Sequence, residues 1–246
     1  MKKLSNPATL GILCTAGGLL CLAARLWLVT AGVDHKGLLI PGHPGDLLSW
    51  LTAAAVAAVM ALALWGQKPK CRFVPSLHSC AGTLAMTVGF AITAGELLAG
   101  GTVISLVTGI FGLVSALCGV YTAFCQYKGQ RASLLIRCPA IVFFMLLLVC
   151  RYQLWSAEPQ VQRYGFQLFA LVCLTLAAYQ RAALEGGTGS AVFYLAASRG
   201  AVFFCLAATA GSGHGVFYLL MAIATLLDGC RCLHRRPLGD QSHEPA

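Results

Sequence analysis

Charged side chains are scarce in this 246-residue sequence. Asp, Glu, Lys and Arg together make up 10% of it, whereas hydrophobic residues make up 58%. An ordinary soluble domain carries roughly a quarter charged residues, so the composition excludes a water-soluble fold of this size. The net charge is +9, but the basic residues do not gather along one helix or patch. The sequence therefore does not predict binding to nucleic acid.

Catalytic sequence motifs are also absent. The chain has no His-Glu-x-x-His, no Gly-x-Ser-x-Gly and no glycine-rich phosphate loop that ends in Lys-Ser or Lys-Thr. No motif indicates a cofactor. We therefore do not predict an enzyme, and we assign no catalytic residue.

The sequence consists instead mainly of long apolar runs. A helix that crosses the hydrocarbon layer needs about 20 predominantly apolar residues. Eight segments of about this length follow one another along the chain, and we place them at residues 7–30, 46–66, 77–97, 102–126, 138–155, 161–184, 190–210 and 214–232. The fold class that we predict is an all-α, polytopic helical membrane bundle of about eight transmembrane helices. Residues 1–236 form one bundle, and residues 237–246 form a short tail.

Lys and Arg indicate the orientation of the bundle. Twelve basic residues fall in or near alternate connectors: Lys2, Lys3, Lys68, Lys70, Arg72, Lys128, Arg131, Arg137, Arg181, Arg231, Arg235 and Arg236. Four others, Arg25, Lys36, Arg151 and Arg163, fall toward the opposite side, whose connectors contain no cysteine. Cytoplasmic loops are enriched in Lys and Arg. We therefore expect a multi-pass protein of the cell membrane with both termini in the cytoplasm and without disulfides.

Small residues recur at helical spacing in two of the segments. Ser105, Gly109, Gly112, Ala116 and Gly119 share one face of the fourth segment. Gly11, Thr15 and Gly18 share a face of the first, and the same spacing leads on to Arg25. Such faces let helix backbones approach closely. We expect both faces to pack against other helices, and Arg25 to face protein rather than lipid.

Two similar segments are consistent with an internal duplication. Arg25-Leu-Trp ends the first span, and Arg151-Tyr-Gln-Leu-Trp ends the fifth. Each half would hold four spans, so the halves would be parallel repeats. Chance resemblance is the alternative.

The segments Asp34 to Pro44, Arg151 to Pro159 and Tyr164-Gly-Phe166 resemble those of uncharacterised multi-span integral membrane proteins from Gram-positive anaerobes. The resemblance implies a many-helix membrane fold and carries no activity with it.

The connector before the second span is rich in groups that bind metals. Asp34, His35, His43 and Asp46 lie within thirteen residues, and imidazole and carboxylate groups are common ligands of divalent metals. In the alternative interpretation Asp46 is the N-cap of the second helix and the Pro-Gly pairs form turns. The sequence leaves both interpretations open.

Arg199 lies in the middle of the seventh span, where an isolated charge is costly. The short connector to the eighth span makes these helices antiparallel neighbours, and reflection through the turn places Leu226 opposite Arg199, with Asp228 two residues further on. We therefore predict a buried charge pair between Arg199 and Asp228. Pairing with Glu185, or extension toward the headgroups, is the alternative. Other polar residues that we expect inside the bundle or at its outer face are Arg25, Glu96, Arg151 and Arg163.

Three functions are compatible with these features. The first is transport, either by a small-solute permease or by the membrane subunit of a larger transporter with an ATPase partner, because ionisable residues inside a helical bundle often line solute pathways. The second is a non-catalytic scaffold or assembly factor, and the third is an extracytoplasmic metal-dependent enzyme. A polar cavity would favour transport, a dry interior would favour the scaffold, and a cleft around Asp34, His35 and His43 would favour the enzyme.

Overall fold

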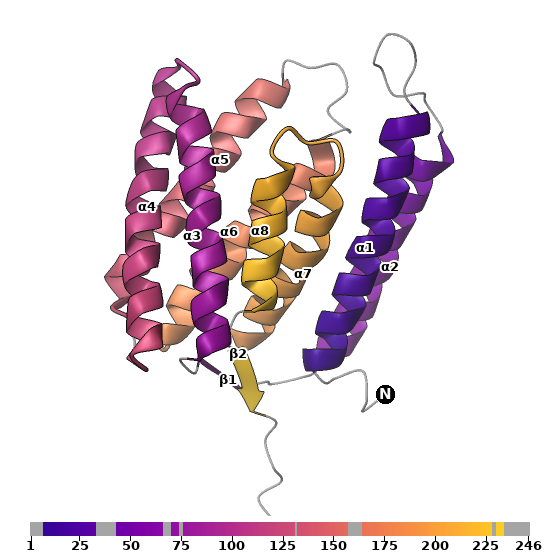
Figure 1. Ribbon diagram of the computed structural model, residues 1–246. Coiled ribbons are helices and arrows are strands. Elements are labelled where there is room, and N and C mark those ends of the chain that lie inside the picture. Colours follow the sequence, from indigo (N-terminus) through magenta and orange to yellow (C-terminus); the bar gives the residue numbers. More distant parts are fainter. Residues whose placement is uncertain are drawn as a thin grey trace, which may run out of the picture.

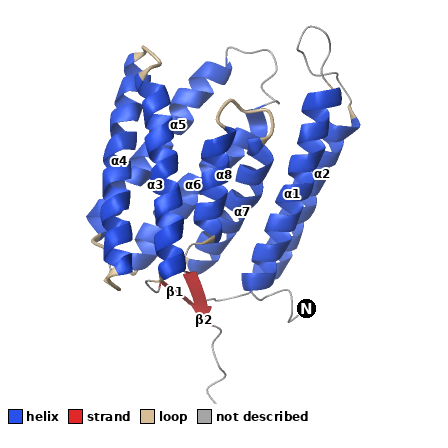
Figure 2. Ribbon diagram, in the orientation of Figure 1, coloured by secondary structure: helices blue, strands red, loops and turns tan. Residues whose placement is uncertain are grey.

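The computed structural model describes residues 7–32, 43–65, 70–73, 76–130, 132–156, 164–227 and 230–233. Within these ranges the chain forms eight α-helices, one 3-10 turn and two short strands (Figures 1 and 2). Their bounds are α1 Pro7–Ala31, α2 Pro44–Leu64, β1 Lys70–Phe73, α3 Leu77–Leu98, α4 Val103–Tyr127, η1 Leu134–Arg137, α5 Cys138–Ser156, α6 Gly165–Glu185, α7 Ala191–Thr209, α8 Gly215–Leu226 and β2 Cys230–Leu233.

Seven of the described helices, α1 to α7, are long and apolar enough to cross a membrane. The prediction of a polytopic helical bundle is therefore confirmed, and the chain is a multi-pass membrane protein. Most helices begin close to the positions expected from the sequence. Thr102, for example, caps α4 by accepting a hydrogen bond from the Ser105 amide, and the Ser105 hydroxyl in turn accepts one from the Thr102 amide.

The eighth span differs from the prediction. We expected it to run to residue 232, but α8 has 12 residues and ends at Leu226, a length of about 18 Å. Residues Cys230–Leu233 instead form β2, which pairs antiparallel with β1 and sets Cys71 opposite Cys232. The sequence already contains a turn signal, Asp-Gly, at positions 228 and 229. Because β1 precedes α3 and β2 follows α8, the chain returns through α8 to the side on which α3 begins.

The start of α2 also differs. We offered Asp46 as its N-cap, but the helix begins at Pro44 and His43 is the N-cap, with its Nδ1 atom accepting a hydrogen bond from the Gly45 amide at 3.1 Å. Proline is favoured at the first helical position, which shifts the boundary two residues earlier. Asp46 lies in the first turn, where a carboxylate interacts favourably with the helix dipole.

The helices form a body of six, α3 to α8, with the α1–α2 hairpin at one side (Figure 1). Helix α1 contacts the body through α7, and α3 packs against α4 and α8. Both predicted small-residue faces lie in these contacts. A Cβ atom on Gly18 would lie 3.3 Å from the Phe203 Cα of α7, and one on Gly112 would lie 2.9 Å from the Ala94 Cβ of α3.

The two halves of the chain do not pack alike. A parallel repeat would match α6 and α7 to α2 and α3. Helices α6 and α7 pack along their length, whereas α2 packs mainly on α1, and α3 on α4 and α8. The proposed duplication therefore gains no support from the packing and stays a hypothesis.

Aromatic side chains fill the centre of the six-helix body. The rings of Phe90, Phe143 and Phe144 are fully buried and meet one another, with the Phe90 centroid 5.0 Å from Phe143 and 5.3 Å from Phe144. Offset and edge-on ring contacts of this kind add to the burial of apolar area. This cluster forms the floor of the cavity described next.

Candidate functional site

Three charged side chains meet at the end of the bundle near the β-strands. Arg137 comes from η1, and Arg181 and Glu185 come from the last turns of α6. The Arg137 Nε atom lies 2.7 Å from one Glu185 oxygen, and the Arg181 Nε atom lies 3.7 Å from the other. Both arginine side chains are 15% exposed, and the Glu185 side chain is 20% exposed. Two cations therefore share this carboxylate, and these three described side chains together sum to one positive charge.

Local structure positions this group. Arg181 and Glu185 are four residues apart on α6, so they lie on the same helical face. The helix ends at Glu185, and Gly187, two residues further on, has a φ of 84°, a conformation that glycine adopts without strain. In the following turn the Gln180 side chain accepts a hydrogen bond from the Ser190 amide at 3.2 Å. This contact fixes the α6–α7 connection beside the charged group.

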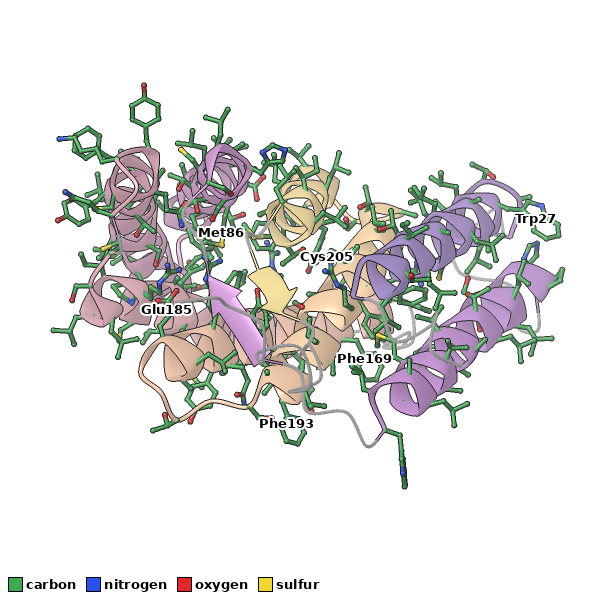
Figure 3. The ribbon with its side chains drawn as sticks, turned by 90° about the horizontal axis from the view of Figure 1, so that it is seen from below. Trp27, Met86, Phe169, Glu185, Phe193 and Cys205 are labelled. Atoms are coloured by element: carbon green, nitrogen blue, oxygen red, sulfur yellow. The ribbon has the colours of Figure 1, made fainter. Side chains whose placement is uncertain are left out.

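A cavity of about 90 Å³ extends inward from Arg137 and Arg181. All six helices of the α3–α8 body contribute to its walls. Thr83, Ser198 and Thr225 supply hydroxyl groups, whereas Met86 and Phe90 belong to the apolar inner part. Figure 3, which views the bundle from below, shows Met86 and Glu185 on the side away from Trp27 and the α1–α2 hairpin.

The hydroxyl groups of the wall use their hydrogens within the protein. Thr225 donates to the Met221 carbonyl at 2.7 Å, and Ser198 donates to the Leu195 carbonyl at 3.2 Å. Thr83 lies within 2.9 Å of both the Ser79 carbonyl and the Gln126 side-chain oxygen. A hydroxyl that donates in this way still offers lone pairs. The positive charge of the cavity comes from the two guanidinium groups at its mouth.

Glu185 is expected from the sequence only as an alternative partner of Arg199. That pairing is wrong, because Glu185 is engaged by Arg137 and Arg181. Arg137 and Arg181 had been interpreted as topology signals only. The sequence shows that Arg181 lies four residues before Glu185 and that Arg137 lies directly before a helix. It does not show that the two arginines meet, because that depends on how α5 and α6 pack.

A second polar cluster lies at the opposite end of the bundle. His214, at the start of α8, lies with its Nδ1 atom 2.6 Å from a Glu96 oxygen of α3. Burial lowers the pKa of His214, and the nearby charge of Arg151 lowers it further, which together outweigh the opposite effect of Glu96. The neutral ring then donates its Nδ1 hydrogen to the carboxylate. The structure thus brings together Glu96 and Arg151, two of the polar residues expected at the outer face, with His214.

Arg25 is 3% exposed and faces protein, as the spacing of the α1 seam predicts. Its guanidinium carbon lies 4.7 Å from the centroid of the Phe166 ring of α6. A cation over an aromatic face is attracted by the ring quadrupole, most strongly where water is excluded. Arg25 therefore helps to hold the α1–α2 hairpin to the six-helix body.

Arg199 lies in α7 beside Gly11 of α1 and lines a groove with Leu226, the residue that reflection through the α7–α8 turn places opposite it. Asp228, its predicted partner, lies outside the described residues. The Arg199–Asp228 pair therefore stays a prediction.

The metal-binding hypothesis rests mainly on undescribed residues. Asp34 and His35 lie outside the described ranges, as does Arg163. The Nδ1 atom of His43 is occupied by the Gly45 amide, and the ring packs edge-on against Trp27 at 5.3 Å. Among the residues that the structure describes, no three His, Cys, Asp or Glu side chains form a group suited to a metal ion.

Comparison with known proteins returns no relative. No protein-family model matches the chain, and neither the curated proteins nor the solved structures contain a match. Functional assignment therefore depends on the geometry of the sites described above.

Proposed function

We propose that this protein is a cell-membrane transport protein that binds a small amphiphilic anion, such as a short-chain carboxylate or sulfonate, in the α3–α8 cavity. The observation that carries the proposal is the pair of guanidinium groups, Arg137 and Arg181, that share the single carboxylate of Glu185 at the mouth of the cavity. A surplus positive charge in a partly shielded site attracts an anion more strongly than it would in water.

The cavity also limits the size and shape of the ligand. A volume of about 90 Å³ admits a small molecule, and Met86, Phe90 and Met221 make its inner part apolar. A ligand with an anionic head and a short apolar tail matches both regions, with the head at the arginines and the tail toward the phenylalanine cluster. Ligand sites commonly combine apolar walls with a few polar groups that set orientation.

The cavity favours transport over the other two functions. A scaffold needs no cavity that leads inward from a charged end of the bundle. The enzyme considered above depends on Asp34 and His35, which lie outside the described residues, so the cavity itself offers no observation in its favour. The permease and the membrane subunit of a larger transporter share the binding site, and both remain within the proposal.

Binding of 1-propanesulfonate to the purified protein tests the proposal. This anion stays ionised at all relevant pH values and is compared with neutral 1-butanol and cationic propylammonium. We expect saturable binding of the sulfonate alone. The variant Ala178→Phe, which fills the cavity from α6, should abolish binding, whereas Ala91→Phe on the exposed face of α3 should not. Equal binding of the three probes, or unchanged binding in Ala178→Phe, would overturn the proposal.

A further inference from the structure

Arg199 belongs to the middle of α7, but its charge lies near one end of the bundle. Its Cα atom is eight residues after Ala191, about 12 Å along the helix. A Cβ atom on Gly11 would lie 3.2 Å from the Arg199 Nη1 atom and 3.4 Å from Cζ. Gly11 is two residues inside the apolar span Thr9–Ala31, about 3 Å from its start. The side chain therefore extends from mid-span toward the membrane boundary, as long basic side chains do.

The guanidinium group has no anionic partner among the described residues. Its Nε atom is buried and makes no hydrogen bond there. Two described carboxylates near the ends of the bundle are engaged elsewhere, since Glu185 pairs with Arg137 and Glu96 with His214. The side chain as a whole is half-buried, and a buried donor without an acceptor is costly, so an acceptor from outside these residues would stabilise it.

An open groove of about 530 Å³ begins at this guanidinium group. It lies where α1, α7 and α8 meet, with Leu226 at its Arg199 end and Ile12 and Leu19 on its α1 wall. Ile12 is 71% exposed and Leu19 is 52% exposed, so the groove opens outward from apolar spans. The Thr15 hydroxyl in its wall donates to the Gly11 carbonyl at 2.8 Å. Arg199 is thus the cation of an otherwise apolar groove.

We infer that this groove binds an acidic phospholipid from the leaflet that surrounds the N-terminal end of α1. The lipid phosphate lies against the Arg199 guanidinium, and one acyl chain follows Ile12 and Leu19 toward the middle of the bundle. A lipid is the occupant because the groove is apolar along its length and opens from helices that span the membrane. An acidic headgroup is favoured because it carries no cation of its own to compete with Arg199. This site is separate from the anion cavity, which the α3–α8 helices enclose.

Native mass spectrometry of the full-length protein tests this inference. The protein is supplied with phosphatidylglycerol or phosphatidylcholine that have the same acyl chains, and one-to-one adducts are counted. We expect phosphatidylglycerol to be retained about fivefold better, the preference that one basic residue at the membrane boundary supplies. Arg199→Gln should remove this preference, and Arg199→Lys should retain part of it. Lys128→Gln, which removes an exposed cation at the end of α4, should leave it unchanged.

The groove itself is tested by Gly11→Leu, which places a side chain against the guanidinium group. Its control is Gly95→Leu, at a position where a Cβ atom would meet nothing within 4 Å. We expect Gly11→Leu alone to lower lipid retention. Displacement of phosphatidylglycerol by millimolar inorganic phosphate would show a phosphate site instead of a lipid site. The inference would be overturned if Arg199→Gln and wild type preferred phosphatidylglycerol equally. It would also be overturned if wild type showed no preference and Asp228→Asn did, because Arg199 would then be paired with Asp228 in the wild type.

Discussion

The Nε atom of Arg137 lies 2.7 Å from a carboxylate oxygen of Glu185, and the same carboxylate is 3.7 Å from Arg181 on its other side. This relationship joins the 3-10 turn before α5 to the last turn of α6. It also leaves a positive charge at the mouth of the cavity. Each of these two consequences, one for stability and one for binding, leads to a measurable prediction.

Substitution of Glu185 by Gln should change stability and binding in opposite directions. The two arginines would lose their shared carboxylate, so the free energy of unfolding should fall by about 2 kcal/mol, between the values typical of exposed and of buried ion pairs. Anion binding should become tighter, because the mouth gains one positive charge. Reversible unfolding in SDS and titration with 1-propanesulfonate measure the two effects. Arg181→Gln serves as the control, since it should weaken binding. Weaker binding in Glu185→Gln would contradict the electrostatic account of the site.

The seam between α3 and α4 should tolerate no side chain at Gly119. A Cβ atom there would overlap the Thr87 hydroxyl, and overpacking of this kind typically costs about 1–3 kcal/mol. Gly119→Ala should therefore lower the free energy of unfolding by about that amount. Gly95→Ala is the matched control on α3, where a Cβ atom meets no neighbour, and should be neutral or stabilising by up to about 1 kcal/mol. Equal effects of the two substitutions would show that the seam is not closely packed.

His214 should make stability depend on pH. Its pKa is lowered in the folded protein by burial and by Arg151, from an unfolded value of about 6.5. Above pH 6.5 the ring is neutral in both states and its contribution is fully present. As the pH falls from 6.5 toward the folded pKa, the unfolded chain binds the proton more readily, so stability decreases. SDS unfolding between pH 8 and 5 should show this decrease. His214→Gln should reduce it, and an unchanged pH profile in that variant would assign the dependence to other groups.

Thiol labelling tests the orientation of the bundle. Cys138 is exposed and is the first residue of α5, which begins at the end of the bundle near the β-strands (Figure 1). The distribution of Lys and Arg predicts that this side faces the cytoplasm. A membrane-impermeant maleimide should not label Cys138, Cys71 or Cys232 in intact cells, and it should label Cys138 in inverted vesicles. Labelling of any of the three from outside would reverse the topology.

The sequence predicts the helices better than the sites, and the difference has a physical reason. Arg25 could be oriented from sequence because Gly11, Thr15 and Gly18 define one face of the same helix, and helical periodicity extends that face to residue 25. The end of α8 was missed because Cys230–Leu233 pair with Lys70–Phe73. This contact joins distant parts of the chain, and the apolar pattern of one segment contains no information about it.

The candidate site was missed for the same reason. Arg137 and Glu185 belong to separate elements, and their distance depends on how α5 packs against α6. The sequence shows only that Arg181 and Glu185 are four residues apart in one helix, which is a common spacing for an ion pair. Glu96, in contrast, was expected inside the bundle or at its outer face, and the structure adds its direct contact with His214.

Anion flux into proteoliposomes tests the central claim most directly. Protein is reconstituted into vesicles, and uptake of radiolabelled 1-propanesulfonate is followed for wild type, Ala178→Phe and Ala91→Phe. We expect saturable uptake by wild type and by Ala91→Phe at similar rates, and uptake by Ala178→Phe at the rate of protein-free vesicles, because the phenylalanine occupies the cavity between Arg181 and the aromatic floor. Uptake by wild type no faster than protein-free vesicles, or uptake that Ala178→Phe leaves unchanged, would contradict the account.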